Sequence, residues 1–346
     1  MVKGRQPAQK ARRQEIGLGV EDPTLDYLMP EHFVSILAAE LEAFLKFKRN
    51  LGKPYAGGYY TLLNFDRYVA KHHRRRGALD WPTLVNGWLS RGPTRKPGTV
   101  NCNVSVLRQF CLFRRRYDPG GFVPDQQWAP RRPCARFLPD VLSEAQVAQL
   151  IARTGGLKNL PLRRSGMRTL LCVLYSTGLR LGEALRLRWA DVHWKERCFF
   201  IRMSKGRSRL VPFRVDLQKE LENYVDERRR YVSEAPESLL ICRTDGSAYS
   251  VLTASCAIRK LMRAAGFKPA SGRCGPRPHD LRHGFARERL RLWYRSGVDF
   301  QRRLPDLSVY LGHLNLLGTE TYLKATPDLL AVASSRMAAR FKRNQR

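Results

Sequence analysis

Apolar side chains recur at three- and four-residue intervals along the first third of the chain, which is the spacing of amphipathic helices. Within residues 32–47 they are Val34, Leu37, Ala38, Leu41, Phe44 and Leu45. Similar segments cover residues 59–72, 81–89 and 99–117. The pattern predicts a four-helix, all-α domain over residues 27–118.

The composition changes after this segment. Asp118-Pro119-Gly120-Gly121 and several later prolines give residues 119–138 the composition of a linker. A new helix is predicted beyond it, because Ser143 can serve as its N-cap and Gln146 stands at the capping-box position. We therefore expect a second domain over residues 139–346.

The second domain begins with an apolar helix over residues 167–175, which Gly178 can end in a left-handed cap. Alternating residues at 199–203, a turn at 204–207 and an apolar return at 210–213 predict an antiparallel hairpin. Helices resume and continue to the C-terminus. The expected fold class is mainly α, with a four-helix N-terminal domain and an α-rich second domain that contains a small antiparallel β-hairpin or sheet.

The charge balance is the strongest compositional feature. The chain has 63 Lys and Arg against 30 Asp and Glu, a formal net charge of +33. Such an excess disfavours a compact fold by self-repulsion unless a polyanion is the normal partner. Nucleic acid is the favoured partner, with ribosomes or an acidic membrane as the alternatives. The basic residues within positions 1–26 indicate a flexible basic arm, or merely a solvated tail.

The eight cysteines are scattered and form none of the C-x-x-C pairs of a zinc site. The N-terminus has no apolar signal segment, and no stretch approaches the roughly 18 apolar residues of a membrane span. These features predict a cytoplasmic protein with reduced thiols and no membrane partner, associated with the nucleoid when it binds DNA.

Several residues could take part in chemistry on a phosphodiester. Arg180 follows a predicted glycine cap, and its planar guanidinium can make paired bonds to phosphate oxygens. Glu183, three residues later, could orient Arg180, although such a pair is more often a surface ion pair. Lys205 lies at the tip of the predicted hairpin, where it is either simply solvated or placed to enter a DNA groove and donate a proton.

His279, Arg282 and His283 share one face of a predicted helix. Prolines before His279 keep the approach extended and place it at the helix N-terminus, which favours an anion. A polar turn with a packed histidine is one alternative, and a zinc site that includes Cys274 is another. The zinc site lacks a clear further ligand, so the anion site is favoured.

Tyr322 is one of 13 tyrosines, and its residue type alone does not mark it as a functional residue. A phenol has a pKa of about 10, so it needs cationic neighbours and a base to act as a nucleophile. Nearby, Tyr310 lies in an apolar run and is expected in the core. Leu329, Ala333, Met337 and Phe341 recur every four residues and predict one apolar helix face beyond Tyr322.

The order of these residues resembles the tyrosine recombinases, or phage integrases, of mobile elements. The matching features are Arg180 with Glu183, Lys205 in a hairpin, His279-x-x-Arg282, Leu311-Gly312-His313 and Tyr322. The resemblance spans about residues 139–330. Gly182 stands where a serine is frequent and Gly284 where a threonine is frequent. The preceding four helices suit the core-binding (SAM-like) domain of that family.

The resemblance implies a strand transfer that needs no metal, cofactor or ATP. Tyr322 would attack the scissile phosphate, and Arg180 and Arg282 would hold its nonbridging oxygens. Lys205 would protonate the leaving 5′ oxygen and His279 would assist proton transfer from the tyrosine. His313 would bond the phosphate, with Glu183 and His283 in supporting roles.

The implied partner is double-stranded DNA, bound by a homotetramer and, in some members of the family, together with companion recombinases. The C-terminal apolar face would dock on a neighbouring protomer or on its own domain. A type IB topoisomerase-like enzyme and a non-catalytic DNA-binding regulator are the alternative functions. A metal-dependent nuclease or transposase would need a carboxylate cluster, which the sequence does not show.

Overall fold

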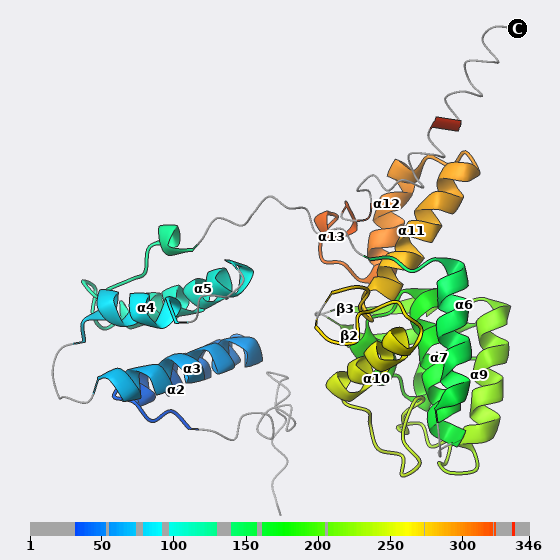
Figure 1. Cartoon of the computed structure of the whole chain (residues 1–346), viewed down its shortest axis with the longest axis horizontal. Coiled ribbons are helices and arrows are strands. Elements are labelled where there is room, and N and C mark those ends of the chain that lie inside the picture. Colours follow the sequence, from blue (N-terminus) through cyan, green and yellow to red (C-terminus); the bar gives the residue numbers. More distant parts are fainter. Residues whose placement is uncertain are drawn as a thin grey trace, which may run out of the picture. The chain divides into compact units, whose positions relative to one another are not determined.

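The computed structural model describes residues 32–52, 55–73, 79–91, 97–129, 140–157, 161–204, 207–272, 274–320, 322 and 334–335. The chain divides into two compact units, Met1–Arg136 and Phe137–Arg346. Figure 1 shows helices in both units, with the small sheet in the second. The domain limits expected from the sequence, at residues 26, 118 and 138, remain predictions.

The described part of the first unit contains four α-helices, which confirms the predicted all-α arrangement. They are α2 (Ala38–Asn50), α3 (Ala56–His72), α4 (Trp81–Leu89) and α5 (Pro97–Arg114), followed by the short 3-10 helix η1 (Gln126–Trp128). Their apolar faces enclose an aromatic core in which Phe44, Phe65 and Phe110 are completely buried. Phe122 and Trp128, from the segment expected to link the domains, pack against this core.

The helix predicted over residues 32–47 begins later than the apolar pattern indicates, at Ala38 rather than near His32. The backbone N–H groups of Val34 and Ser35 donate instead to the Asp66 carboxylate, at 2.7 and 3.0 Å. Asp66 lies on α3 and is completely buried, so these bonds satisfy a carboxylate whose burial would otherwise be costly. The apolar residues before Ala38 therefore lie in a turn that precedes the helix and is held against α3.

The described part of the second unit is also mostly helical. Its elements are α6 (Glu144–Ala152), η2 (Arg153–Gly156), α7 (Pro161–Thr177), α8 (Leu181–Leu185), η3 (Trp189–Asp191), β1 (Val192–His193), β2 (Cys198–Ser204), β3 (Arg207–Pro212), α9 (Val215–Arg228), α10 (Val251–Ala264), α11 (Asp280–Arg295), α12 (Phe300–Leu311) and α13 (Leu317–Glu320). The capping box predicted at the start of α6 is present, with reciprocal bonds between Ser143 and Gln146. α7 ends at Gly178, whose φ of +65° confirms the left-handed cap.

The three strands form one antiparallel sheet in the order β1-β2-β3, so the structure adds a strand to the predicted hairpin. The register pairs Phe199 with Val211 and is interrupted between Ile201 and Ser204. This irregularity breaks the predicted alternation, because it leaves Met203 71% exposed and turns Ser204 inward. It thereby directs a hydroxyl group toward the interior of the unit.

Helix packing brings separate parts of the second unit together around α11. This helix packs against α7 and α12, and α12 also packs against β3 (Figure 1). Phe285, Leu307 and Leu311 form a small apolar cluster there. Tyr310, expected in the core, is only half-buried, and the adjacent Val309 is exposed.

Three predicted features lie outside the described residues. They are the basic arm over residues 1–26, Lys205, and the apolar face of Leu329, Ala333, Met337 and Phe341. Within the described residues, every helix is too short or too polar to cross a membrane.

Candidate active site

Arg180 occupies the N-cap position of α8, just after the glycine that ends α7. Its backbone N–H donates to Glu183 Oε2 at 2.9 Å, and its guanidinium donates to Glu183 Oε1 at 2.7 Å. The guanidinium also donates to the Gly312 carbonyl at 2.9 Å. The predicted Arg180–Glu183 pair is therefore present, and it is tied to the end of α12.

The buried carboxylate of Glu183 receives more hydrogen bonds than the sequence suggests. Ser204 Oγ donates to Oε1 at 2.5 Å, and Arg209 donates to Oε1 at 3.3 Å and to Oε2 at 2.9 Å. Burial raises the pKa of Glu183, but the bonds from Arg209, Ser204 and Arg180 and the charge of Arg209 outweigh it and lower the pKa to about 2. Glu183 is therefore ionised at neutral pH.

Arg209 and Ser204 were not among the residues predicted from the sequence, although the strand pattern contains a signal for Arg209. Along the returning strand, Arg209, Val211 and Phe213 alternate with exposed neighbours. Residues two apart on a strand share one face, so Arg209 lies on the inward face of β3. An inward-facing arginine needs a hydrogen-bond acceptor. The strand pattern therefore indicates a buried carboxylate near Arg209.

Arg282 is buried on α11, and backbone carbonyls hold its guanidinium. Nη1 donates to the Gly178 carbonyl at 2.8 Å, and Nη2 donates to the Leu311 carbonyl at 2.6 Å and to His313 Nε2 at 2.9 Å. Burial lowers the pKa of Arg282, and the neighbouring Tyr322 raises it. Because the two carbonyls lie at the ends of α7 and α12, these helix ends set the position of the guanidinium.

His313 follows Gly312, which ends α12 in the left-handed conformation with a φ of +67°. Its Nε2 must accept a hydrogen bond from Arg282, because a guanidinium can only donate. A neutral imidazole then carries its proton on Nδ1, which donates to Thr319 Oγ1 at 2.7 Å. Thr319 is completely buried, so this bond fixes both the orientation and the tautomer of the ring.

His279 is the N-cap residue of α11, as the preceding prolines predict. His279 as a whole residue is exposed, but partial desolvation of its imidazole and interactions with His283, Arg282 and Arg277 lower the pKa of His279 to about 4. Burial also lowers the pKa of His283. Both imidazoles are therefore neutral at pH 7 and can accept a proton.

Tyr322 is only 6% exposed and lies among these side chains. Its ring is 5.1 Å from the ring of His283, edge to face, and 5.9 Å from the ring of His313. It also belongs to the apolar cluster around Phe285 and Leu311. The tyrosine and the buried arginine of α11 therefore share one site.

The described structure brings together seven of the eight residues singled out from the sequence, namely Arg180, Glu183, His279, Arg282, His283, His313 and Tyr322. The eighth, Lys205, lies outside the described residues. Among those described, no group of three or more His, Cys, Asp or Glu residues is placed to hold a metal ion. The zinc arrangement considered for His279, His283 and Cys274 is therefore not formed.

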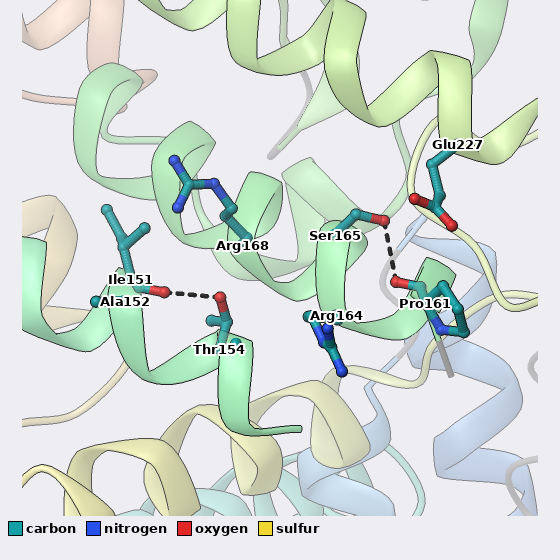
Figure 2. A pocket seen from close by; sticks show the side chains of 9 residues that line it. Ile151, Ala152, Thr154, Pro161, Arg164, Ser165, Arg168 and Glu227 are labelled. Atoms are coloured by element: carbon teal, nitrogen blue, oxygen red, sulfur yellow. Dashed lines mark hydrogen bonds between the residues drawn. The ribbon is translucent and has the colours of Figure 1, made fainter. Parts of the chain in front are cut away.

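A pocket of about 330 Å³ lies elsewhere in the second unit, lined by residues of α6, η2, α7 and α9 (Figure 2). The hydroxyl groups of Thr154 and Ser165 on its wall donate to backbone carbonyls of the preceding turn. Arg168, also on the wall, donates to Glu220 at 3.0 Å. None of the candidate site residues lines this pocket, so it has no part in the arrangement around Tyr322.

Comparison with known proteins identifies the class. Residues 140–328 match the phage integrase family. The Sinorhizobium fredii protein y4rE, named as an integrase/recombinase, is 32% identical over 88% of this chain and 96% of its own length. The tyrosine recombinase XerA of Pyrococcus furiosus is 29% identical over 69% of this chain and 73% of its own length. The chain belongs to the phage integrase family, and it is a tyrosine-type site-specific recombinase.

Solved structures support the same fold. The XerH site-specific recombinase, bound to a palindromic difH substrate, matches 91% of this chain and 89% of its own with a TM-score of 0.63 and 19% identity. The Tn1549 transposon integrase, in complex with transposon right end DNA, matches 87% of this chain and 98% of its own with a TM-score of 0.60 and 14% identity. These likenesses confirm the predicted fold class.

Proposed function

We propose that Tyr322 is the nucleophile with which this recombinase cuts and rejoins DNA through a 3′-phosphotyrosyl intermediate, without metal or ATP. The observation that carries the proposal is the enclosed position of Tyr322 against His283 and His313, beside the buried Arg282. A phenol needs nearby cations and a base before it can attack phosphorus. The described site offers both.

In the cleavage step, the Tyr322 oxygen forms a bond to phosphorus and the bond from phosphorus to the 5′ oxygen of the DNA breaks. The tyrosine proton passes to His279, which its lowered pKa leaves neutral, and Lys205 supplies a proton to the 5′ oxygen. The covalent link retains the energy of the phosphodiester. A 5′-hydroxyl from another strand can therefore reverse the step without ATP.

Arg180 and Arg282 hold the nonbridging oxygens while negative charge builds on them. Their guanidiniums are fixed in advance by Glu183 and by backbone carbonyls, so little reorganisation is needed when the phosphate arrives. Neutral His313 supports Arg282 through Nε2. When Nε2 takes up a proton it gives up this bond and can donate to a phosphate oxygen instead. His283 packs against the phenol and limits its movement.

The DNA partner is part of this proposal. XerH was solved bound to a palindromic difH substrate and the Tn1549 integrase in complex with transposon right end DNA, and the net charge of +33 suits a polyanion. We extend the proposal to a tetramer of this chain on two duplexes, acting alone or with companion recombinases. Such an assembly places a second 5′-hydroxyl where it can attack the phosphotyrosyl bond.

Covalent trapping tests the proposal. Duplexes that the full-length protein binds are first selected from random sequence, because its target sequence is not known. They are then nicked near each candidate cleavage position, so that the released fragment diffuses away, and are incubated with protein both with and without EDTA. Denaturing electrophoresis measures the covalent protein–DNA band. Tyr231→Phe serves as the control, since Tyr231 is 42% exposed and takes no part in the site.

We expect the band with wild type and with Tyr231→Phe, but not with Tyr322→Phe, which still binds the DNA. A band that persists in Tyr322→Phe shows that another residue is the nucleophile. No band with wild type on DNA that it binds supports a non-catalytic regulator instead. A wild-type band that EDTA abolishes contradicts the metal-free reaction.

A further inference from the structure

We infer that Arg209 is a positioning residue for strand cleavage, because it fixes and charge-balances Glu183, which in turn orients Arg180 toward the scissile phosphate. The inference rests on the function proposed above. It adds a residue of β3 to a site in which Ser204 of β2 also bonds to Glu183.

Arg209 contacts both groups that hold Arg180, namely the Glu183 carboxylate and the Gly312 backbone. Its Nη2 donates to Glu183 Oε2 at 2.9 Å, and its Nε donates to the Tyr310 carbonyl at 2.8 Å. Its guanidinium also packs against Gly312, where an added Cβ would lie 2.6 Å from Nη1. Arg180 binds the same carboxylate and the Gly312 carbonyl. Arg209 therefore braces the two groups that hold Arg180.

The charges explain why a second arginine is needed. The side chain of Glu183 is 1% exposed and that of Arg209 is 8% exposed. With Glu183 alone, the charge of Arg180 would be cancelled, and little net attraction for a phosphate would remain. With Arg209 the group of three carries one net positive charge, and the buried carboxylate does not depend on Arg180 alone for compensation.

The shape of the side chain matters as well. A guanidinium presents a planar fork that binds both oxygens of a carboxylate, and an ammonium cannot reproduce this geometry. Two bonds to Glu183 and a third to the backbone fix the plane of the Arg209 guanidinium. The carboxylate is then held in the orientation that Arg180 requires.

The same sheet supplies a matched control. Arg202 on β2 donates to Asp191 at 2.5 Å, and the Asp191 side chain is 2% exposed. The Arg202 pair therefore resembles the Arg209 pair in having a buried carboxylate, but it makes no contact with Arg180 or Glu183 among the described hydrogen bonds. Arg202→Met tests for the general effect of losing such a pair.

The experiment measures the rate of covalent complex formation at saturating DNA, and the Kd for the same DNA, with full-length proteins. We expect Arg209→Met to slow cleavage on the order of 100-fold, the effect of a misplacement of about 1 Å, while its Kd changes less than about threefold. Arg202→Met should cleave within about twofold of wild type. Glu183→Gln should slow cleavage to a similar extent as Arg209→Met.

The double variant Arg209→Met/Glu183→Gln separates positioning from a general loss of structure. If Arg209 acts through Glu183, the double variant cleaves no more slowly than Glu183→Gln. Removing both charges also avoids an unpaired buried carboxylate, so this comparison stands even where Arg209→Met alone unfolds. Effects that multiply in the double variant, or an Arg209→Met rate within threefold of wild type, overturn the inference. Loss of trapping in the wild type would instead count against the proposed function.

Discussion

Replacing Gly178 by alanine adds one methyl group where α7 ends. Gly178 has a φ of +65°, a conformation that costs an L-residue about 1–2 kcal/mol. The added Cβ would lie 2.6 Å from Phe285 Cδ1 and 3.0 Å from Leu311 Cδ2. Both side chains are buried, so overpacking adds about 1–3 kcal/mol. We expect the free energy of unfolding of the second unit to fall by about 2–5 kcal/mol.

The same substitution should affect catalysis. The Gly178 carbonyl accepts the hydrogen bond from Arg282 Nη1 at 2.8 Å, and relief of the clash must move either this backbone or the side chains against it. A shift of about 1 Å at a reacting group can lower the rate by about 100-fold. We therefore expect Gly178→Ala to bind DNA but to form the covalent complex much more slowly than wild type.

Gly266→Ala is the control, because Gly266 has a φ of +76° and no atom within 4 Å of an added Cβ. It should lose only the backbone contribution of about 1–2 kcal/mol. Urea denaturation gives the free energy of unfolding, and hydrogen exchange of peptides from α7 and α11 localises the loss. Equal losses in the two variants would refute the packing argument. A wild-type cleavage rate in Gly178→Ala would show that this carbonyl does not position Arg282.

Two further predictions concern side chains of the site. Thr319→Val keeps the shape of Thr319 but removes the acceptor for His313 Nδ1–H. Single-turnover cleavage should slow by about tenfold, the effect of one lost buried hydrogen bond. An unchanged cleavage rate would mean that the tautomer of His313 does not matter. The pKa of Glu183 falls from 4.5 to about 2 on folding, so its ionisation contributes roughly 3 kcal/mol of stability above pH 4.5, which is lost as the pH falls through about 2. In acid titrations of unfolding, wild type should therefore lose stability more steeply than Glu183→Gln between about pH 5 and pH 2, and equal slopes would contradict the assignment.

Local sequence patterns predict those parts of the structure that local interactions decide. The four helices of the first unit, the Ser143–Gln146 capping box and the cap at Gly178 all follow from spacing and residue type. The pairing of Arg180 with Glu183 also follows, because both residues belong to one helical turn. Such features need no knowledge of the rest of the chain.

Features that depend on distant partners are not predictable in this way. α2 starts at Ala38 because Asp66, far along the chain, binds the preceding backbone. The inward turn of Ser204 depends on an irregularity in strand register that no alternation reveals. The acceptor of the His313 ring proton, Thr319, is set by the turn after α12. In each case a tertiary contact overrides or completes the local pattern.

The arrangement of charges also accounts for how several arginines lie close together in the site. Arg180, Arg209 and Arg282 lie close enough to repel one another. Glu183 binds the first two and leaves the three groups with one net positive charge, whereas the partners of Arg282 are two backbone carbonyls and a neutral imidazole. Because carbonyl dipoles orient a guanidinium without cancelling its charge, Arg282 keeps its full charge, which in the proposed reaction would act on the scissile phosphate. In the proposed reaction, such a charge would give the preorganised electrostatic stabilisation that the negative charge developing on the phosphate requires.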